Sequence, residues 1–213
     1  MLVTGVSFSG GDIMPWLDIF LIAVVMGQGA SGYFASDKAL ARLMIMVLLL
    51  VIALPLARPL GREIGGALPG LGELAWEDRF LLPVAGGEIP VDLGPWQASL
   101  GVPAGTGPEQ VKAYLSRIQG LIMAVIGYLT GLAALAFPLM LVFNGKGKPT
   151  MKGLAVGLVG GMAAVLLLLV LIPPLALTSY GGFLAQGLEE SALSNLLLPV
   201  TTWLVQGVAR FFL

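Results

Sequence analysis

The chain has 213 residues, of which 57% are hydrophobic and 11% are charged, and its formal net charge is −1. Soluble domains carry about 25% charged residues, so this composition excludes most soluble proteins, and the near-neutral charge offers no footprint for nucleic acid. The sequence contains no histidine and no cysteine, which removes the commonest acid–base catalyst and the usual ligands of haem and zinc. We therefore expect a membrane protein that is not an enzyme and holds neither a cofactor nor a metal.

Residues 16–34 and 39–57 are the first two predicted membrane helices. Both approach the roughly 20 apolar residues that cross about 30 Å of hydrocarbon at about 1.5 Å per residue. Pro15 suits a first helical turn, and Trp16 suits the membrane interface. A short polar turn joins the two helices, so the pattern predicts a tight N-terminal transmembrane hairpin over residues 1–57.

Residues 58–112 follow as a proline- and glycine-rich loop in which acids outnumber bases. Its tryptophans and apolar runs are not typical of a flexible linker. Residues 80–84 and 88–92 favour a small irregular β-hairpin. We expect this loop to form a compact cap on the outer ends of the helices.

Residues 118–143 and 153–178 are the third and fourth predicted spans. The third helix is expected to begin ahead of the membrane at Pro108, where a proline followed by an acid favours a helix start. Together the two helices predict a C-terminal transmembrane hairpin over residues 113–180.

Residues 181–213 form a tail with mixed character. Leucines spaced like one face of a helix alternate with polar residues between Phe183 and Leu197, which favours an amphipathic helix at the membrane interface. After Pro199 the chain is apolar but short for a full span. We expect this last stretch to lie at the outer surface or against the bundle, and the alternative is a fifth crossing.

The predicted fold is an all-α integral membrane protein with four transmembrane helices, a proline- and glycine-rich extracytoplasmic loop and an amphipathic tail. The four segments are 1–57, 58–112, 113–180 and 181–213. An even number of crossings places both short basic turns on one face, and the positive-inside rule puts that face in the cytoplasm of a bacterial inner membrane. The long loop and both termini are then outside.

The orientation rests on a bias in basic residues. The bases of the two short turns are Lys38, Arg42, Lys146, Lys148 and Lys152. The bases that flank the long loop and reduce this bias are Arg58, Arg62, Lys112 and Arg117.

Glycines recur every four residues on the third and fourth spans. They are Gly127 and Gly131 on the third span and Gly153, Gly157 and Gly161 on the fourth, and Ala23, Gly27 and Ser31 continue the theme on the first. Small residues at this spacing let helix backbones approach closely. The pattern indicates packing within the bundle, and the alternative is a seam for a partner protein or a second copy of the chain.

Asp18 and Gln28 are the candidate intramembrane polar residues. An ionised carboxylate at hydrocarbon depth costs a few kcal/mol, so Asp18 is a functional candidate by default. The simpler interpretation places Asp18 at the headgroups beside Trp16, as a first-turn acid that complements the dipole of its own helix. Gln28 lies among glycines, where unwound backbone lines solute paths in transporters, and its simpler interpretation is helix packing.

Four short motifs occur in order along the chain. They are Trp16-Leu17-Asp18-Ile19 and Gly32-Tyr33 in the first span, Met151 to Leu158 at the start of the fourth, and Glu190-Ser191-Ala192-Leu193 in the tail. In this order they resemble the colicin V production (CvpA) family of membrane proteins. The resemblance implies a bacterial inner-membrane protein linked to toxin export and envelope homeostasis.

Three functional hypotheses follow. The first is a scaffold or accessory protein that binds other membrane proteins, or itself, within the lipid bilayer. The second is a cofactor-free accessory subunit of a large energy-converting membrane complex. The third is a channel or transporter for a small solute around Gln28. The lack of a catalytic inventory and the abundance of small-residue seams favour the first.

Overall fold

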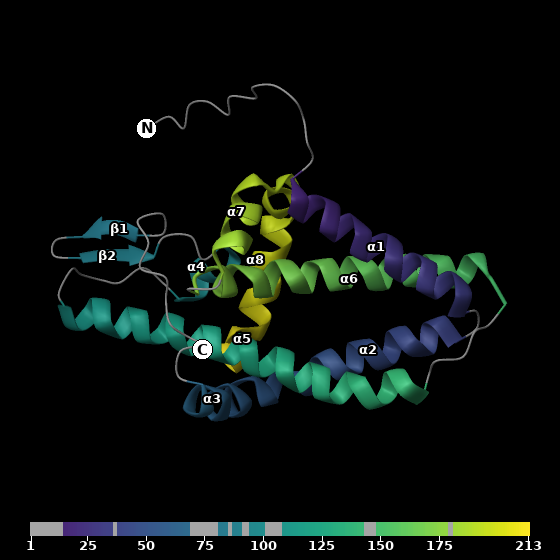
Figure 1. The fold of residues 1–213 in the computed structure, drawn as a ribbon, viewed down its shortest axis with the longest axis horizontal. Coiled ribbons are helices and arrows are strands. Elements are labelled where there is room, and N and C mark those ends of the chain that lie inside the picture. The colour runs from purple at the N-terminus through teal and green to yellow at the C-terminus, as the bar shows by residue number, and fades with distance from the viewer. Residues whose placement is uncertain are drawn as a thin grey trace, which may run out of the picture.

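The computed structural model describes residues 15–35, 38–68, 81–84, 87–90, 94–100, 108–142, 148–178 and 181–213. The expectations for residues 1–14, for the middle of both short turns and for the rest of the outer loop lie outside these residues. The described helices are α1 (Trp16–Ala35), α2 (Ala39–Ala53), η2 (Leu54–Leu56), α3 (Ala57–Ala67), η5 (Gly94–Trp96), α4 (Gln97–Leu100), α5 (Pro108–Val142), α6 (Met151–Ala176), α7 (Gly182–Glu190) and α8 (Ala192–Phe212). The strands are β1 (Leu81–Val84) and β2 (Gly87–Pro90) (Figure 1).

Five helical stretches of the described chain are long and apolar enough to cross a membrane. They are Trp16–Ala35, Ala39–Ala67, Lys112–Ala136, Met151–Ala176 and Ala192–Phe212. Four of them overlap the predicted spans, and the fifth is α8, in the segment expected to be an interfacial tail. The chain is accordingly a helical protein with the composition of a multi-pass membrane protein.

α1 packs most extensively against α6, and its contact with its sequence neighbour α2 is small. The two helices run antiparallel, so that Gly32 near the end of α1 lies at Gly153 near the start of α6. At the other end, Leu17 and Leu21 share a buried cluster with Leu169. The expected tight packing of the first two helices is not formed, because glycine faces on α1 and α6 allow a closer approach than the bulky side chains of α2.

Helical structure continues beyond residue 57, where the second predicted span ends. α2 passes through the 3-10 turn η2 into α3. Pro55 stands in the first turn of η2, where a missing N–H costs little. α3 then packs along α5, and a Cβ on Gly127 would lie 2.8 Å from the Cα of Gly61. The first part of the expected loop is therefore a helix held against the bundle at backbone distance.

Gly127→Ala is expected to destabilise this α3–α5 seam by about 2 kcal/mol, the middle of the range for overpacked interiors. The new Cβ would overlap the carbonyl oxygen of Ala57, so the two helices would have to move apart. The midpoint of SDS-induced unfolding, followed by circular dichroism, measures the loss. Gly120→Ala on the same helix is the control, because nothing lies within 4 Å of its Cβ position. Equal losses in the two variants would contradict the seam.

One short piece of the outer loop is anchored among the helices. η5 and α4 lie against α8, and Trp96 of η5 is fully buried. Its indole N–H donates to the carbonyl oxygen of Val170 on α6 at 2.7 Å, and its ring centre lies 5.2 Å from that of Phe212 on α8. A buried tryptophan with a satisfied N–H combines a large apolar contact with a fixed direction. This part of the loop therefore rests on the bundle.

The strands β1 and β2 form a two-stranded antiparallel hairpin. Leu81 pairs with Pro90, and Val84 pairs with Gly87. The hairpin lies between residues 80 and 92, where the sequence indicates it. Both strands are edges, which is the position in a sheet that tolerates proline, since proline cannot donate to a ladder.

α8 is one continuous helix of 21 residues that runs through Pro199. Proline in a helix removes one backbone hydrogen bond. Next to it, the Thr201 hydroxyl donates to the carbonyl oxygens of Leu197 and Leu198, and the Thr202 hydroxyl donates to Leu198 at 2.8 Å. Threonine hydroxyls of this kind help membrane helices to tolerate proline.

α8 runs across α5 and α6 instead of alongside them (Figure 1). Along its length it also touches η5, α4, η2 and α3. Because α8 makes only a short contact with each of these elements, it lies across the bundle. α3, α4, α7 and α8 therefore gather toward the end of the bundle that faces away from the two short turns (Figure 1).

Candidate functional site

Asp18 lies at the junction of α1, α7 and α8. Its side chain is 2% exposed, so it is enclosed by protein. The buried polar side chains of the described residues are Asp18, Thr178, Ser191 and Thr201, and Asp18 is the acid among them. A buried carboxylate needs hydrogen-bond partners, because an uncompensated charge in apolar surroundings is strongly destabilising.

Three donors at the start of α8 meet this carboxylate. The Ser191 hydroxyl donates to Oδ1 of Asp18 at 2.5 Å, the N–H of Ala192 donates to Oδ2 at 3.1 Å, and the N–H of Leu193 donates to Oδ1 at 3.3 Å. The first N–H groups of a helix have no partner within it, and its N-terminus carries a partial positive charge. Asp18 therefore stabilises α8, whereas the sequence favoured a role at the headgroups for the dipole of its own helix.

Ser191 connects Asp18 to the backbone of α8. Its hydroxyl donates to the carboxylate, and its oxygen accepts the N–H of Ser194 at 3.0 Å, as the N-cap of the helix. Ser191 is fully buried, and it stands 173 residues away from Asp18 in the chain. This pair ties the first helix to the last.

Trp16 covers one side of the junction. Its ring centre lies 5.9 Å from that of Phe183 on α7, and a Cβ at Gly187 would overlap the indole. Trp16 is 39% exposed and Phe183 is 63% exposed, so the aromatic pair forms a surface rim over the buried carboxylate.

The three predicted glycines of α6 all face α1. A Cβ on Gly157 would lie 3.0 Å from the Cα of Gly32, and a Cβ on Gly161 would lie 2.7 Å from the Cα of Val25. A Cβ on Gly153 would overlap the carbonyl oxygen of Gly32. The two backbones are thus in direct contact, and these glycines form an internal seam.

The contact face of α1 differs from the expected one. Gly27 has nothing within 4 Å of its Cβ position, and Ala23 and Ser31 are exposed. The face that meets α6 instead contains Gly29 and Gly32. The closest backbone contacts with α6 therefore come from a different face of α1 than the expected stripe.

The two predicted glycines of α5 form a second internal seam. Gly127 meets the backbone of α3, and a Cβ on Gly131 would lie 3.1 Å from the side chain of Leu60 and 3.5 Å from that of Leu56. Both contacts are made with residues of η2 and α3. The sequence assigns this stretch partly to the second predicted span, which ends at residue 57, and partly to the long loop.

Gln28 lines a small cavity between α1, α2 and α6, which it shares with Arg42 of α2. The cavity measures about 70 Å³. This space accommodates about two water molecules, whereas ligand pockets occupy about 300–1,000 Å³. The geometry at Gln28 therefore fits helix packing better than a solute path.

A larger cavity of about 670 Å³ lies between α3, α5 and the end of α8. Arg58 and Arg62 of α3 and Arg117 of α5 line it. The sequence identifies these residues only as charges that flank the long loop. Their position around one cavity depends on α3 lying along α5, which no local pattern predicts. The sequence signal for Ser191 was a serine ahead of an apolar run, which is a typical N-cap.

A scan against protein-family models finds no match, and no curated protein or solved structure matches the chain. Two of the short motifs noted in the sequence nevertheless meet in the structure. Asp18 belongs to the first motif, and Ser191, Ala192 and Leu193 belong to the last.

Proposed function

We propose that the chain is a non-enzymatic scaffold or accessory protein of a bacterial inner membrane, which acts by binding other membrane proteins. The observation that carries this proposal is the link from Asp18 to the first turn of α8. It holds the last helix in one position across a closed bundle. A surface presented on a rigid element recognises a partner more precisely than one on a loop.

Because the glycine seams lie inside the bundle, a partner protein would bind to another part of the surface. Gly153, Gly157 and Gly127 are all in contact with helices of the same chain, so they are not open to a partner. The outward side of α8 is open. Leu196 is 73% exposed and Trp203 is 71% exposed. Exposed apolar surface of this kind meets either lipid or another protein.

In the proposed topology α1, α2, α5 and α6 cross the bilayer and α8 lies along its interface. The crosswise course of α8 supports this arrangement (Figure 1). At about 100° per residue, the outward side of α8 has two flanks. Leu196, Val200 and Trp203 form the apolar flank, and Asn195, Gln206 and Arg210 form the polar one, all of them exposed. An interfacial helix needs one flank in the acyl chains and another in water.

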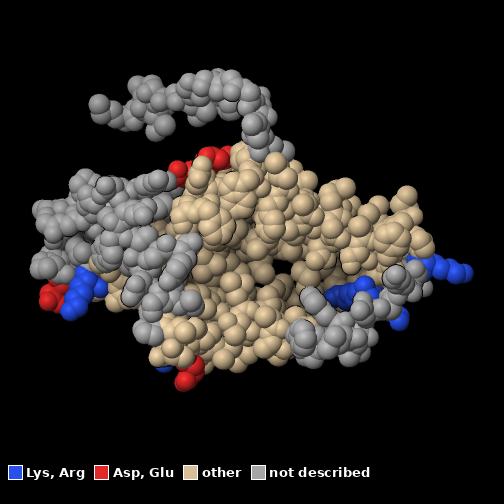
Figure 2. Space-filling model, in the orientation of Figure 1, with Lys and Arg blue, Asp and Glu red and all other residues tan. Residues whose placement is uncertain are grey.

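The proposed orientation places the short turns in the cytoplasm. Figure 2 shows basic side chains without acidic ones at the end of the described surface where α1 meets α2 and α6 begins. Lys38, Lys148 and Lys152 lie there and are exposed. Because cytoplasmic loops carry an excess of lysine and arginine, the hairpin, α7 and α8 are assigned to the extracytoplasmic side.

A role like that of the colicin V production family, in toxin export and envelope homeostasis, is part of this proposal. Its support is the contact between Asp18 and Ser191, which joins two of the motifs that carry the resemblance. The family's motifs would then serve to attach the last helix.

Photocrosslinking in the native bacterial membrane tests the proposal. A photoreactive residue at Trp203, on the outward side of α8, is expected to give discrete protein adducts, and Asp18→Ala is expected to weaken them. The same residue at Met26, which is 63% exposed on α1, is the control and should give mostly lipid adducts. Lipid adducts alone from both positions, with a lone monomer in mild detergent, would contradict a scaffold. Adducts to a pigmented complex would instead favour an accessory subunit of that complex.

A further inference from the structure

We propose that the cavity between α3, α5 and the end of α8 binds the phosphate-bearing headgroup of an anionic membrane lipid. Its volume of about 670 Å³ lies within the range of about 300–1,000 Å³ for ligand sites. Among the described residues that line it, the ionised side chains are those of Arg58, Arg62 and Arg117, and no side chain is acidic.

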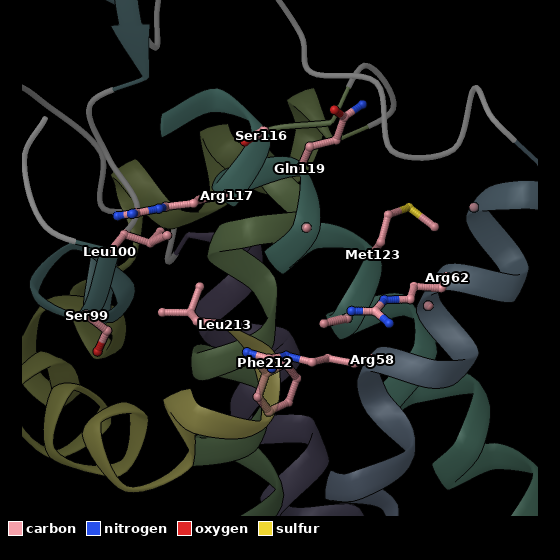
Figure 3. A pocket seen from close by; sticks show the side chains of 14 residues that line it. Arg58, Arg62, Ser99, Leu100, Ser116, Arg117, Gln119, Met123, Phe212 and Leu213 are labelled. Atoms are coloured by element: carbon pink, nitrogen blue, oxygen red, sulfur yellow. The ribbon is translucent and has the colours of Figure 1, made fainter. Parts of the chain in front are cut away.

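These arginines are poised for an external anion. Within the described part of the chain, none of the three forms a hydrogen bond or an ion pair. Arg58 and Arg62 carry like charges toward the same space, and a phosphate bound there would neutralise part of that charge (Figure 3). The planar donors of arginine match phosphate oxygens in pairs, which is the geometry preferred for this anion.

Figure 3 shows how the side chains are arranged around the space. Arg58 and Arg62 extend from α3 toward the middle of the cavity, and Arg117 lies on its other side near Leu100. Gln119 and Ser99 add neutral groups to the lining. In Figure 3 the guanidinium groups of Arg58 and Arg62 face the space, whereas the polar ends of Gln119 and Ser99 lie at its edge.

The remaining lining suits the glycerol and acyl part of a lipid. Met123, Phe212 and Leu213 contribute apolar surface. Gly120 leaves room, because nothing lies within 4 Å of its Cβ position. Apart from Ser99, Leu100 and Leu213, the lining residues belong to helical stretches that are apolar enough to cross a membrane. A lipid reaches such a place directly, and arginine is a residue that binds phosphate groups in pairs of hydrogen bonds.

The basic surface continues beyond this cavity. Arg58 and Arg62 also line an adjoining hollow of about 610 Å³, together with Arg210 from α8 and one acid, Glu63. The guanidinium of Arg210 lies 4.9 Å from the ring centre of Phe211. The site therefore connects α3 to the end of α8, and a bound lipid would contact the helix that carries the proposed partner surface.

Native mass spectrometry of the full chain, delipidated in a nonionic detergent, tests the site. Titration with phosphatidylglycerol is expected to give one tightly retained lipid, and phosphatidylcholine at the same concentration is expected to give none. Replacing Arg58, Arg62 and Arg117 together by glutamine should weaken retention by about a hundredfold, at about fivefold for each arginine. Gly120→Leu should also abolish it, because the side chain fills the cavity and leaves all charges in place.

The matched control replaces Lys38, Lys148 and Lys152 by glutamine, which removes the same charge from the opposite end of the bundle. Retention equal to wild type in this control is expected. An equal loss in the control and in the arginine variant would overturn the proposal, as would full retention in Gly120→Leu. Inorganic phosphate distinguishes the source of the anion: if it displaces the lipid at micromolar concentration, the site takes a soluble phosphate and the lipid assignment is wrong. Thermal unfolding of each variant verifies that it is folded.

Discussion

Gly32→Ala is expected to open the α1–α6 seam and to destabilise the protein by about 3 kcal/mol, the upper part of the range for overpacked interiors. The added Cβ would overlap the carbonyl oxygen of Gly153 and lie 2.7 Å from the Cα of Gly157. Both are backbone atoms, so no side-chain rotation relieves the contact. Since α1 packs most extensively against α6, their separation weakens the main contact between helices. The midpoint of SDS-induced unfolding, followed by circular dichroism, measures this loss.

Gly27→Ala is the matched control on the same helix. Nothing lies within 4 Å of its Cβ position, and alanine favours the helix over glycine. Its unfolding midpoint should equal or slightly exceed that of the wild type. The reverse order, with Gly27→Ala less stable than Gly32→Ala, would mean that α1 presents the face expected from the sequence and not the one in the structure.

The positions of the spans could be predicted because an uninterrupted apolar run is a local property. Residues 16–34 and 153–178 nearly coincide with α1 and α6. The second span was harder, because α3 contains Arg58, Arg62 and Glu63 and resembles a loop by hydropathy. It is held as a helix by its backbone contact at Gly61, which belongs to tertiary structure.

The spacing of glycines predicts that a helix face is small, but it does not identify the opposing helix. Gly153, Gly157 and Gly161 could be recognised as a packing face, whereas their partner is α1 and not a neighbour in sequence. On α1 the expected stripe was chosen for its regular spacing of four. The actual face contains Gly29 and Gly32, because the crossing of two helices and not strict periodicity decides which residues meet.

The candidate site could not be predicted from local sequence patterns, because it also depends on which helices meet. Asp18 could be assigned to a helix start from neighbouring residues, whereas Ser191 lies inside the amphipathic helix expected between Phe183 and Leu197 and is in fact the N-cap of α8. Their hydrogen bond joins positions 173 residues apart, so it depends on how α1, α7 and α8 are assembled. The convergence of Arg58, Arg62 and Arg117 likewise requires α3 to lie along α5.

Asp18→Ala is expected to release the start of α8 and to cost about 3 kcal/mol. The change removes the acceptor of three donors at once, and it leaves the hydroxyl of Ser191 and the N–H groups of Ala192 and Leu193 without their partner. Buried donors that lose a charged acceptor are costly, because water does not replace it. Hydrogen exchange of the amides in the first turn of α8 should accelerate by about a hundredfold, since about 1.4 kcal/mol corresponds to a factor of ten.

Two further variants separate the attachment of α8 from a general loss of charge. Glu190→Gln changes an exposed acid on α7 that is hydrogen-bonded to Gln186, and it should alter stability by less than about 0.5 kcal/mol. Ser191→Ala removes both the N-cap and the donor to Asp18, so its effect and that of Asp18→Ala should add up to more than the effect of the double variant. Strict additivity, or unchanged exchange in α8 of the Asp18→Ala protein, would mean that the carboxylate does not hold the last helix, and the proposed scaffold surface would lose its physical basis.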